Sequence, residues 1–270
     1  MSDLTLMAVH AHPDDEVIGT GGVLAAAAAE GIRTVLVTCT GGELGDAPGG
    51  IKPGEPGHDP AAVARLRRTE LAESARLLGI SHVETLGYHD SGMAGWDGNA
   101  RAEAFANVPL ADAAARVAEL MERYRPQVVV TYDENGGYGH PDHIQAHRVA
   151  RAAADATGIP AKFYYTAVQR SAIQELFALA ADLGLDLGDG PPDDFGVPDE
   201  AITTRVDVAA HADVKRKALE AHASQGDGAM LLSLPPEIRA RVFGTEMFTR
   251  VASSVPVPDD EDDLFAGLRG

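Results

Sequence analysis

The stretch LTLMAVHAHPDDEVIGTGG, Leu4–Gly22, decides the fold, because a short apolar run passes within it into a cluster of titratable residues. Leu4–Val9 is short and apolar, as expected of a strand that is buried on both faces. Val17–Glu30 follows as an alanine-rich helix, and Gly31 suits the left-handed residue that ends many helices. The titratable residues therefore lie where a buried strand passes into a helix.

The same alternation of strand and helix continues through the first 168 residues. The predicted strands are Leu4–Val9, Ile32–Thr38, His82–Leu86, Val128–Tyr132 and Lys162–Val168, and the predicted helices are Val17–Glu30, Ala61–Leu78, Leu110–Tyr124 and Pro141–Ala156. This order is typical of parallel strands joined by right-handed helical crossovers. We therefore expect a Rossmann-like α/β fold with an open, mostly parallel sheet and helices on both faces.

The pattern loosens after residue 170. We expect a helix over Ser171–Ala181, a strand over Ile202–Val208, a helix over Ala209–Ala223 and then a polar tail. The acidic segment 182–200 is interpreted as a solvated loop rather than a cation site. These elements indicate a smaller α+β extension behind the parallel sheet.

Composition and charge exclude several classes of partner. Lys and Arg total 22 against 41 Asp and Glu, giving a formal charge of -19 that would repel a nucleic acid. The single cysteine, Cys39, rules out an internal disulfide and a multi-thiolate metal site, and we expect it to be a small buried hydrophobe. The apolar run Val23–Ala29 is too short to span a membrane, and the acidic start does not resemble a signal peptide. We expect a soluble, cytoplasmic protein with no nucleic-acid or membrane partner.

Two clusters of titratable residues are expected to meet in space. The first follows the first strand, and the second, DENGGYGHPDHIQAH, Asp133–His147, follows the fourth. Ligands of open parallel sheets bind at the carboxyl edge, where the strand order reverses. His12, Asp15 and His143 can there supply two imidazoles and a carboxylate to a tetrahedral Zn²⁺ that keeps one position for water. The clusters thus predict a metal site of the catalytic type.

The neighbouring residues suit the hydrolysis of an amide. Asp14 is placed to take a proton from the water, since zinc lowers the pKa of bound water to about 7. Asp142 is close enough to hold an imidazole in one tautomer, and a cationic His140 would stabilise developing negative charge. Tyr138, in a glycine-rich context, can reach the same oxyanion or the leaving group.

A dinucleotide site is the competing interpretation of the first cluster, since Gly19, Gly21 and Gly22 lie near the first crossover. The G-x-G-x-x-G pattern would need a glycine at Leu24, and negative side chains fill the turn. We therefore discount it.

The motifs AHPDDE and GGYGHPDH together resemble the paired signature of the zinc-dependent LmbE-like, or PIG-L, de-N-acetylases, and the similarity extends over nearly the whole chain. Members of this family hydrolyse the acetamide of N-acetylglucosamine conjugates. The resemblance implies that His12, Asp15 and His143 bind zinc. It also implies that Asp14 is the general base and that His140 assists the oxyanion. On this interpretation residues 1–170 form the catalytic domain, and 171–270 pack on it and line the substrate pocket.

Other stretches resemble the mycothiol-pathway members more narrowly. RRTELAESARLLG places Arg67 like an arginine that contacts substrate, and GYHDSGMAGW places Asp90 like a carboxylate that binds sugar hydroxyls. The alternatives are a solvated charge on an amphipathic helix for Arg67 and a turn-ending role for Asp90. Met93 and Trp96 wall the sugar pocket, or only anchor their loop.

The expected function is removal of an N-acetyl group from a small molecule of the N-acetylglucosaminyl-inositol type. The sequence does not decide whether the protein forms a homo-oligomer. FANVPL is similar to the deacetylase, whereas ITTRVDV and KALEAHASQ are more similar to the mycothiol S-conjugate amidase. Leu44 departs from the amidase pattern, which has arginine there. The amidase, a natural-product deacetylase and a non-catalytic metal- or sugar-binding module remain as alternatives.

The remaining histidines carry less signal. His147 lies one turn beyond His143 and is expected to be structural, and His10 to be a core histidine with a backbone partner. No motif supports a role for His58, His82, His89, His211 or His222.

Overall fold

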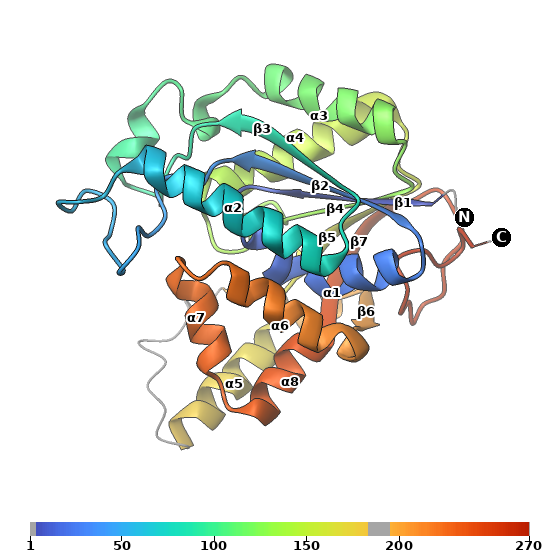
Figure 1. Ribbon diagram of the computed structural model, residues 1–270. Coiled ribbons are helices and arrows are strands. Elements are labelled where there is room, and N and C mark those ends of the chain that lie inside the picture. Colours follow the sequence, from blue (N-terminus) through green and yellow to red (C-terminus); the bar gives the residue numbers. More distant parts are fainter. Residues whose placement is uncertain (1–3, 183–194, 270) are drawn as a thin grey trace.

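A seven-stranded sheet carries helices on both faces in the computed structural model, which describes residues 4–182 and 195–269 (Figure 1). The strands are β1 (Thr5–His10), β2 (Arg33–Thr40), β3 (His82–Tyr88), β4 (Val128–Thr131), β5 (Lys162–Ala167), β6 (Thr204–Asp207) and β7 (Thr245–Ser253). The helices are α1 (Asp15–Ala29), α2 (Pro60–Leu78), α3 (Leu110–Tyr124), α4 (Pro141–Thr157), α5 (Arg170–Asp182), α6 (Ala212–Ala221), α7 (Gly226–Ser233) and α8 (Pro236–Gly244). The open, mostly parallel α/β fold expected from the sequence is confirmed.

The strand order β3-β2-β1-β4-β5-β7-β6 creates a switch point at β1. β1 pairs in parallel with β2 on one side and with β4 on the other. The chain therefore leaves β1 in one direction and β4 in the opposite direction, which opens a crevice above their carboxyl ends. The two motifs follow these two strands.

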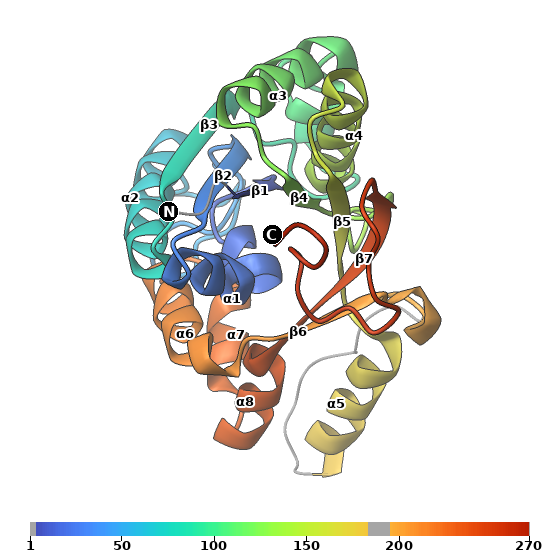
Figure 2. The same ribbon diagram turned by 90° about the vertical axis from the view of Figure 1, so that its right-hand side faces the viewer.

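Each face of the sheet has its own hydrophobic core. Along β1, Met7 and Val9 pack on the side of α3 and α4, whereas Leu6 and Ala8 pack on the side of α1 and α2. Successive strand residues point to opposite faces, so a strand covered on both sides is apolar throughout. Figure 2 shows α3 and α4 on one side of the sheet and α1 on the other. Burial on both faces makes β1 a rigid support for the residues that follow it.

Local signals place the helix ends near the predicted positions. Asp59 accepts a hydrogen bond from the N–H of Ala61 at the start of α2, and Gly79 ends that helix with φ of 71°. At α4 the capping side chain is His140, whose Nδ1 accepts from the N–H of Asp142 at 3.1 Å. A residue of the second motif is therefore fixed by the start of its helix.

The predicted polar tail is wrong, because α7, α8 and β7 follow residue 223. β7 enters the sheet antiparallel to β5 and β6, and its buried positions include Glu246 as well as Phe248. A charged residue at an inward position breaks the apolar alternation that identifies a strand, so the pattern missed it. The predicted helix 209–223 is a short 3₁₀ turn followed by α6.

Most of the acidic segment 182–200 lies outside the described residues, namely positions 183–194. Its end is described from residue 195, and Asp199–Ala201 form a 3₁₀ turn. Among the helices of residues 4–182 and 195–269, none combines the length and apolarity that a bilayer crossing requires.

A buried ion pair between two residues of the C-terminal part of the chain packs against α1. Glu246 of β7 accepts hydrogen bonds from the N–H groups of Gly22 and Val23, and it pairs with Lys215 of α6 at 2.7 Å. Gly22 also lets Val208 lie close to α1, since a Cβ at Gly22 would lie 2.5 Å from a methyl carbon of Val208. The glycine near the first crossover serves close packing of two chain segments.

A second buried carboxylate fastens the C-terminal segment to the sheet. Glu261 accepts hydrogen bonds from Lys162, Thr204 and Tyr164, and it pairs with Arg250 at 2.7 Å. Burial opposes its charge, but the hydrogen bonds from Lys162, Thr204 and Tyr164 outweigh this and lower the pKa of the Glu261 carboxyl. One carboxylate thus joins β5, β6 and β7.

The variant Glu261→Gln is expected to lose about 3–5 kcal/mol of unfolding free energy, because it leaves the Lys162 ammonium buried without its counter-charge. Urea unfolding near pH 7 measures this. The native pKa of Glu261 is lowered, so the stability due to its charge is present above the ordinary pKa of 4.5 and is lost as pH falls through the native value. The difference between wild type and variant should therefore shrink in acid.

Glu73→Gln is the matched control, since Glu73 forms only an exposed pair with Arg76 on α2. Its unfolding midpoint should stay close to that of wild type. Equal losses in the two variants would contradict the role of Glu261 as a fastening point.

Candidate metal centre and active site

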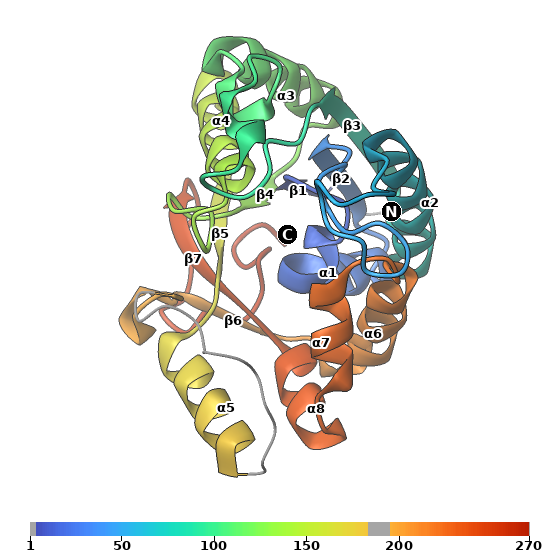
Figure 3. The same ribbon diagram turned by 90° about the vertical axis from the view of Figure 1, so that its left-hand side faces the viewer.

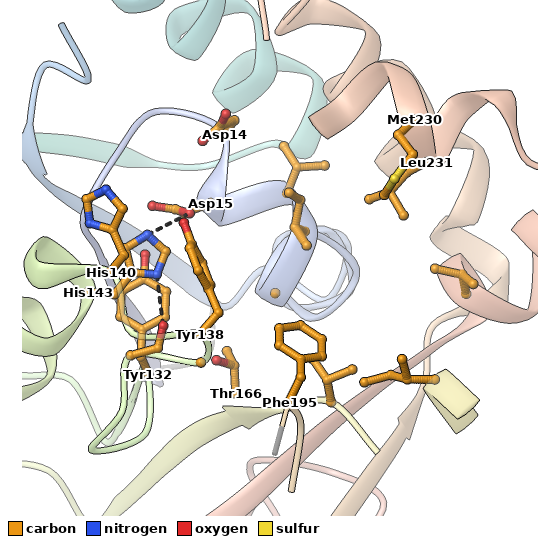
Figure 4. Close-up of a pocket in the computed structure, with 18 of the residues that line it drawn as sticks. Asp14, Asp15, Tyr132, Tyr138, His140, His143, Thr166, Phe195, Met230 and Leu231 are labelled. Carbon is orange, nitrogen blue, oxygen red and sulfur yellow. Dashed lines mark hydrogen bonds and ion pairs between the residues drawn. The ribbon is translucent and has the colours of Figure 1, made fainter. Parts of the chain in front are cut away.

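Three side chains from the two motifs converge at the switch point, and Figure 4 shows two of them, Asp15 and His143. His12 lies between β1 and α1, Asp15 begins α1, and His143 lies in the first turn of α4. Nδ1 of His12 lies 3.2 Å from Nε2 of His143 and 3.4 Å from Oδ2 of Asp15, and Nε2 of His143 lies 3.4 Å from Oδ1 of Asp15. The convergence expected from the spacing is therefore present.

The hydrogen bonds on the far edges of both imidazoles set their tautomers. Nε2 of His12 donates to Oδ2 of Asp142 at 3.1 Å, which turns its Nδ1 towards His143. Nδ1 of His143 donates to the carbonyl of Gly136 at 3.1 Å, which leaves its Nε2 as a lone pair. Nδ1 of His12, Nε2 of His143 and a carboxylate oxygen of Asp15 then lie 3.2–3.4 Å apart, with a hydrogen bond between the two imidazoles whose proton a divalent cation would replace.

The geometry and the charge of this group suit a tetrahedral divalent ion. Bonds of 2.0–2.1 Å place neighbouring ligand atoms about 3.3–3.4 Å apart, close to the observed separations. Burial opposes charge on His12, but hydrogen bonds with Asp142 and Asp15 raise its pKa well above the usual range. Burial also opposes charge on Asp15, but the nearby His143 and His12 lower its pKa well below the usual range. The pocket thus stabilises positive charge among these atoms.

His140 lies within the same cluster, with one nitrogen within 4.8 Å of nitrogens of His12 and His143. Burial, together with repulsion from these two imidazoles, lowers the pKa of His140 to about 3. Its Nδ1 accepts from the backbone N–H of Asp142, so its Nε2 carries the proton. The expected cationic His140 is therefore neutral here, and it offers a neutral N–H donor to the pocket.

Asp142 contacts two imidazoles, whereas the sequence led us to expect that it holds one. It holds the tautomer of His140 through its backbone N–H, while its carboxylate orients His12. The hydroxyl and the N–H of Ser91 both donate to that carboxylate. A fully buried carboxylate bonded on all sides fixes the His12 ring rigidly.

Asp14 lies beside the cluster in a strained backbone conformation, with φ of 108°. Its carboxylate pairs with Arg67 at 3.1 Å. Burial raises the pKa of Asp14 to about 7, although Arg67 opposes the shift. A carboxylate of this kind exchanges protons near neutrality.

Arg67 is buried rather than a solvated charge on α2. Besides pairing with Asp14 it donates hydrogen bonds to the carbonyls of Gly42 and Pro13, which joins the loops after β2 and β1. Gly42 has φ of 63°, and a Cβ there would lie 2.4 Å from the guanidinium. The arginine thus positions the Asp14 loop and also lines the cavity.

The sequence reasoning missed a buried network behind Asp14. Glu16 accepts from the backbone N–H of Asp14 at 2.9 Å, from the hydroxyl of Ser74 at 2.6 Å and from Nε2 of His222 at 2.8 Å. Glu16 is the last residue of the AHPDDE motif, so the sequence did indicate that it belongs near the site. His222 lies 206 residues further along the chain, within the stretch KALEAHASQ, whose similarity to the amidase was the available signal. This network holds the strained Asp14 backbone from α2 and from the end of α6.

Two other histidines and the cysteine are structural. His147 donates to the carbonyl of Tyr132 at 3.0 Å, as expected of a structural histidine. His10 is buried but bonds to the hydroxyls of Tyr132 and Thr20 instead of a backbone group. Cys39 is a buried free thiol, as expected.

The ring of Tyr132 stacks on His143 at 4.2 Å between centroids, which adds a further constraint on the metal cluster.

The cluster lies in a cavity of about 900 Å³. Tyr138, Met93 and Trp96 line it and are 46%, 37% and 43% exposed. Asp90 also lines it, but its Oδ2 accepts from Leu44 and its Oδ1 from Gly92, so each oxygen already holds one backbone N–H. The residues expected to contact substrate are therefore brought to one cavity.

Residues 7–154 match the sequence profile of PIG-L, described as GlcNAc-PI de-N-acetylase. The chain belongs to this family. It is 43% identical, over 98% of this chain and 95% of the relative, to the 1D-myo-inositol 2-acetamido-2-deoxy-alpha-D-glucopyranoside deacetylase of Acidothermus cellulolyticus. The matched region holds the metal cluster, Asp14 and Arg67, whereas His222 lies beyond it.

Two solved structures show that the fold of this PIG-L protein accompanies different reactions. The N,N'-diacetylchitobiose deacetylase of Pyrococcus horikoshii is similar with a TM-score of 0.58 and 21% identity, covering 92% of this chain and 83% of the other. The 4-carboxy-2-hydroxymuconate hydratase of Pseudomonas putida is similar with a TM-score of 0.62 and 21% identity, covering 94% and 99%. The fold alone therefore does not identify the reaction.

The variant His143→Ala is expected to bind Zn²⁺ more than 100-fold more weakly than wild type, because it removes one of the three converging ligand atoms. Equilibrium dialysis followed by metal analysis measures the affinity. His82→Ala is the control, since His82 is exposed on β3 and should leave the affinity unchanged. Full metal binding by His143→Ala would refute the site.

Asp142→Asn tests the support of the first histidine. The amide can still contact His12 but cannot accept with two charged oxygens, so the metal affinity should fall by about 10–100-fold while the fold is retained. The same dialysis measures this, together with the far-ultraviolet circular dichroism spectrum. An unchanged affinity would show that the carboxylate does not act through His12.

Proposed function

We propose that this protein is a metal-dependent amidohydrolase that removes the N-acetyl group from an N-acetylglucosamine-containing small molecule of the glucosaminyl-inositol type. The name of the relative from Acidothermus cellulolyticus supports this substrate class. The observation that carries the proposal is the pair of imidazole nitrogens that face each other beside Asp15, with the strained Asp14 next to them. This is a metal centre built for chemistry on a substrate in a cavity.

We propose Zn²⁺ as the metal, held by His12, Asp15 and His143. Two imidazoles and a carboxylate are typical of catalytic zinc sites that keep one position open. A divalent ion there supplies a Lewis acid that acidifies water and polarises an amide carbonyl. The tautomers set by Asp142 and Gly136 present the correct nitrogens for this role.

Asp14 acts as the general base in this proposal. Its carboxylate lies beside the ligands but is not one of them, so it is available to take a proton from the attacking water. Arg67 orients it at 3.1 Å, and Glu16 holds its backbone N–H. The protonated carboxyl then passes the proton to the leaving amine, since a base that has accepted a proton becomes the acid of the next step.

His140 and Tyr138 stabilise the charge that develops on the amide oxygen. The Nε2–H of His140 is the only N–H left on that ring, because Nδ1 is an acceptor at the start of α4. A fixed neutral donor in a buried site stabilises an oxyanion without prior reorganisation. Tyr138, exposed in the cavity, supplies a second hydroxyl donor to the oxyanion or to the leaving group.

The sugar is proposed to bind on the side of the cavity that holds Asp90, Arg67 and Met93. The Asp90 carboxylate keeps unused lone pairs for sugar hydroxyls, since each of its oxygens accepts one backbone N–H. Residues 1–170 thus supply the reacting groups. Residues 171–270 supply the opposite wall of the cavity, including Met230, Leu231 and Phe243.

The zinc-loaded protein should release acetate and free amine from N-acetylglucosaminyl-inositol, and Asp14→Asn should lower this turnover by about 10²–10⁴-fold while keeping its metal. The released amine is measured by mass spectrometry, and the zinc content by metal analysis. The amide still pairs with Arg67 but cannot accept the proton from water.

Asp155→Asn is the matched control, because Asp155 forms an exposed pair with Arg151 on α4. Its turnover should equal that of wild type. A protein that binds zinc and the sugar but releases no amine would instead be a binding module, and equal turnover by Asp14→Asn would reject Asp14 as the base.

A further inference from the structure

The turn that follows α6 lies behind the loop that carries Asp14. α6 packs against α1 and α2, since Leu219 shares a hydrophobic core cluster with Val17 and Leu78. Figure 3 shows α6 and α7 near α1 and α2, away from α3 and α4. His222 comes directly after α6 and is only 1% exposed. A residue from the C-terminal part of the chain is therefore buried close to the active-site loop.

Glu16 connects this histidine to the backbone of Asp14. Its Oε1 accepts hydrogen bonds from Nε2 of His222 at 2.8 Å and from the hydroxyl of Ser74 at 2.6 Å. Its Oε2 accepts the N–H of Asp14 at 2.9 Å. Two donors thus fix one oxygen of the carboxylate, while the other oxygen holds a residue whose φ of 108° is rare outside glycine.

The hydrogen bond to Glu16 is the only one that the His222 side chain makes within the described part of the chain. Its Nδ1 is buried and has no hydrogen-bond partner there. His10, by contrast, is a buried histidine that uses both ring nitrogens, on the hydroxyls of Tyr132 and Thr20. Buried polar groups are usually satisfied, so a histidine that serves packing alone is expected to bond at both nitrogens. The imidazole of His222 is arranged around a single contact, the one with the carboxylate that holds Asp14.

Other contacts already attach the turn after α6 to its surroundings. Glu70 of α2 accepts hydrogen bonds from the N–H of Ser224 at 3.0 Å and from its hydroxyl at 2.7 Å. Gln225 donates to the carbonyl of Asp46 at 3.2 Å. Neither contact involves Glu16. The attachment of the turn can therefore be tested separately from the contact between His222 and Glu16.

We infer that His222 is a positioning residue for the general base, and that through Glu16 it keeps the Asp14 backbone in its strained conformation beside the metal cluster. The inference rests on the proposed function. Strained backbone persists only where its surroundings hold it, so loss of this contact allows Asp14 to relax away from the attacking water. The C-terminal part of the chain then contributes to the rate of the reaction as well as to the wall of the cavity.

His222→Asn and His222→Gln form a matched pair of variants, because both place an amide in the buried position. The glutamine amide nitrogen takes the place of Nε2 and can donate to Glu16, whereas the asparagine amide nitrogen takes the place of Nδ1 and stops short. His222→Asn should lower kcat for amine release from N-acetylglucosaminyl-inositol by about 10–100-fold, because a small misplacement of a reacting group has effects of this size. His222→Gln should retain most of the wild-type kcat.

The KM and the zinc content of both variants should stay close to the wild-type values, because His222 does not line the cavity and its side chain bonds to Glu16. Far-ultraviolet circular dichroism verifies the fold. His222→Leu, which fills a similar volume without a donor, should show the same loss of kcat and replaces His222→Asn if that variant is unstable. Equal kcat values for the asparagine and glutamine variants would contradict a role through the hydrogen bond.

Ser224→Ala is the control for attachment of the turn. It removes the hydroxyl that donates to Glu70, two residues from His222, and leaves the contact with Glu16 in place. Its urea unfolding midpoint should fall, while its kcat stays at the wild-type value. A fall in kcat as large as that of His222→Asn would show that His222 only fastens the turn.

A double variant tests whether His222 acts through Asp14. In the Asp14→Asn protein the base is already lost, so adding His222→Asn should cause no further fall in kcat. Residues that act independently would instead multiply their losses. Multiplied losses would overturn the positioning role.

The outcomes separate this inference from the proposed function. Amine release by the zinc-loaded wild type and its loss in Asp14→Asn, together with a wild-type kcat in His222→Asn, overturn the inference and leave the amidohydrolase in place. Absence of amine release by the zinc-loaded wild type rejects the proposed function, and the positioning of a base falls with it.

Discussion

The structure depends on the meeting of two imidazole nitrogens at the switch point of a parallel sheet. His12 and His143 face each other at 3.2 Å with their protons held on the far edges by Asp142 and Gly136. A hydrogen bond joins the two facing nitrogens, and a divalent cation would replace its proton. The parallel pairing of β1 with β4 brings the two histidines close enough to share such an ion.

The backbone of Asp14 is held in an unfavourable local conformation by its surroundings. Asp14 has a positive φ, and the groups that restrain it come from separate elements: Arg67 from α2 and Glu16 from α1. Glu16 is itself held by Ser74 and by His222. Strain of this kind persists only where the surroundings over-determine it, so the region after β6 supports the first loop as well as walling the cavity.

The parts predictable from sequence were those with local or periodic signals. The parallel strands and four long helices of the first half follow from apolar runs, caps and glycines, and the convergence of the two motifs follows from the strand order. β7 was missed because Glu246 occupies an inward position, where it binds α1 instead of solvent. His222 lies in the quoted stretch KALEAHASQ, but its role was missed because its contact with Glu16 is made across 206 residues. Pattern reasoning does not detect a buried charge whose partner is remote.

The sequence by itself determined that a His–Asp metal centre follows the first and fourth strands, since residue type and spacing are local properties. The tertiary structure alone decided which nitrogen of each imidazole faces the cluster, that burial and two neighbouring imidazoles lower the pKa of His140, and that Arg67 is buried beside Asp14. It alone decided also that helices from the end of the chain form a wall of the cavity. Tautomers, pKa shifts and cavity walls arise from distances between remote segments, and those distances exist only in the folded chain.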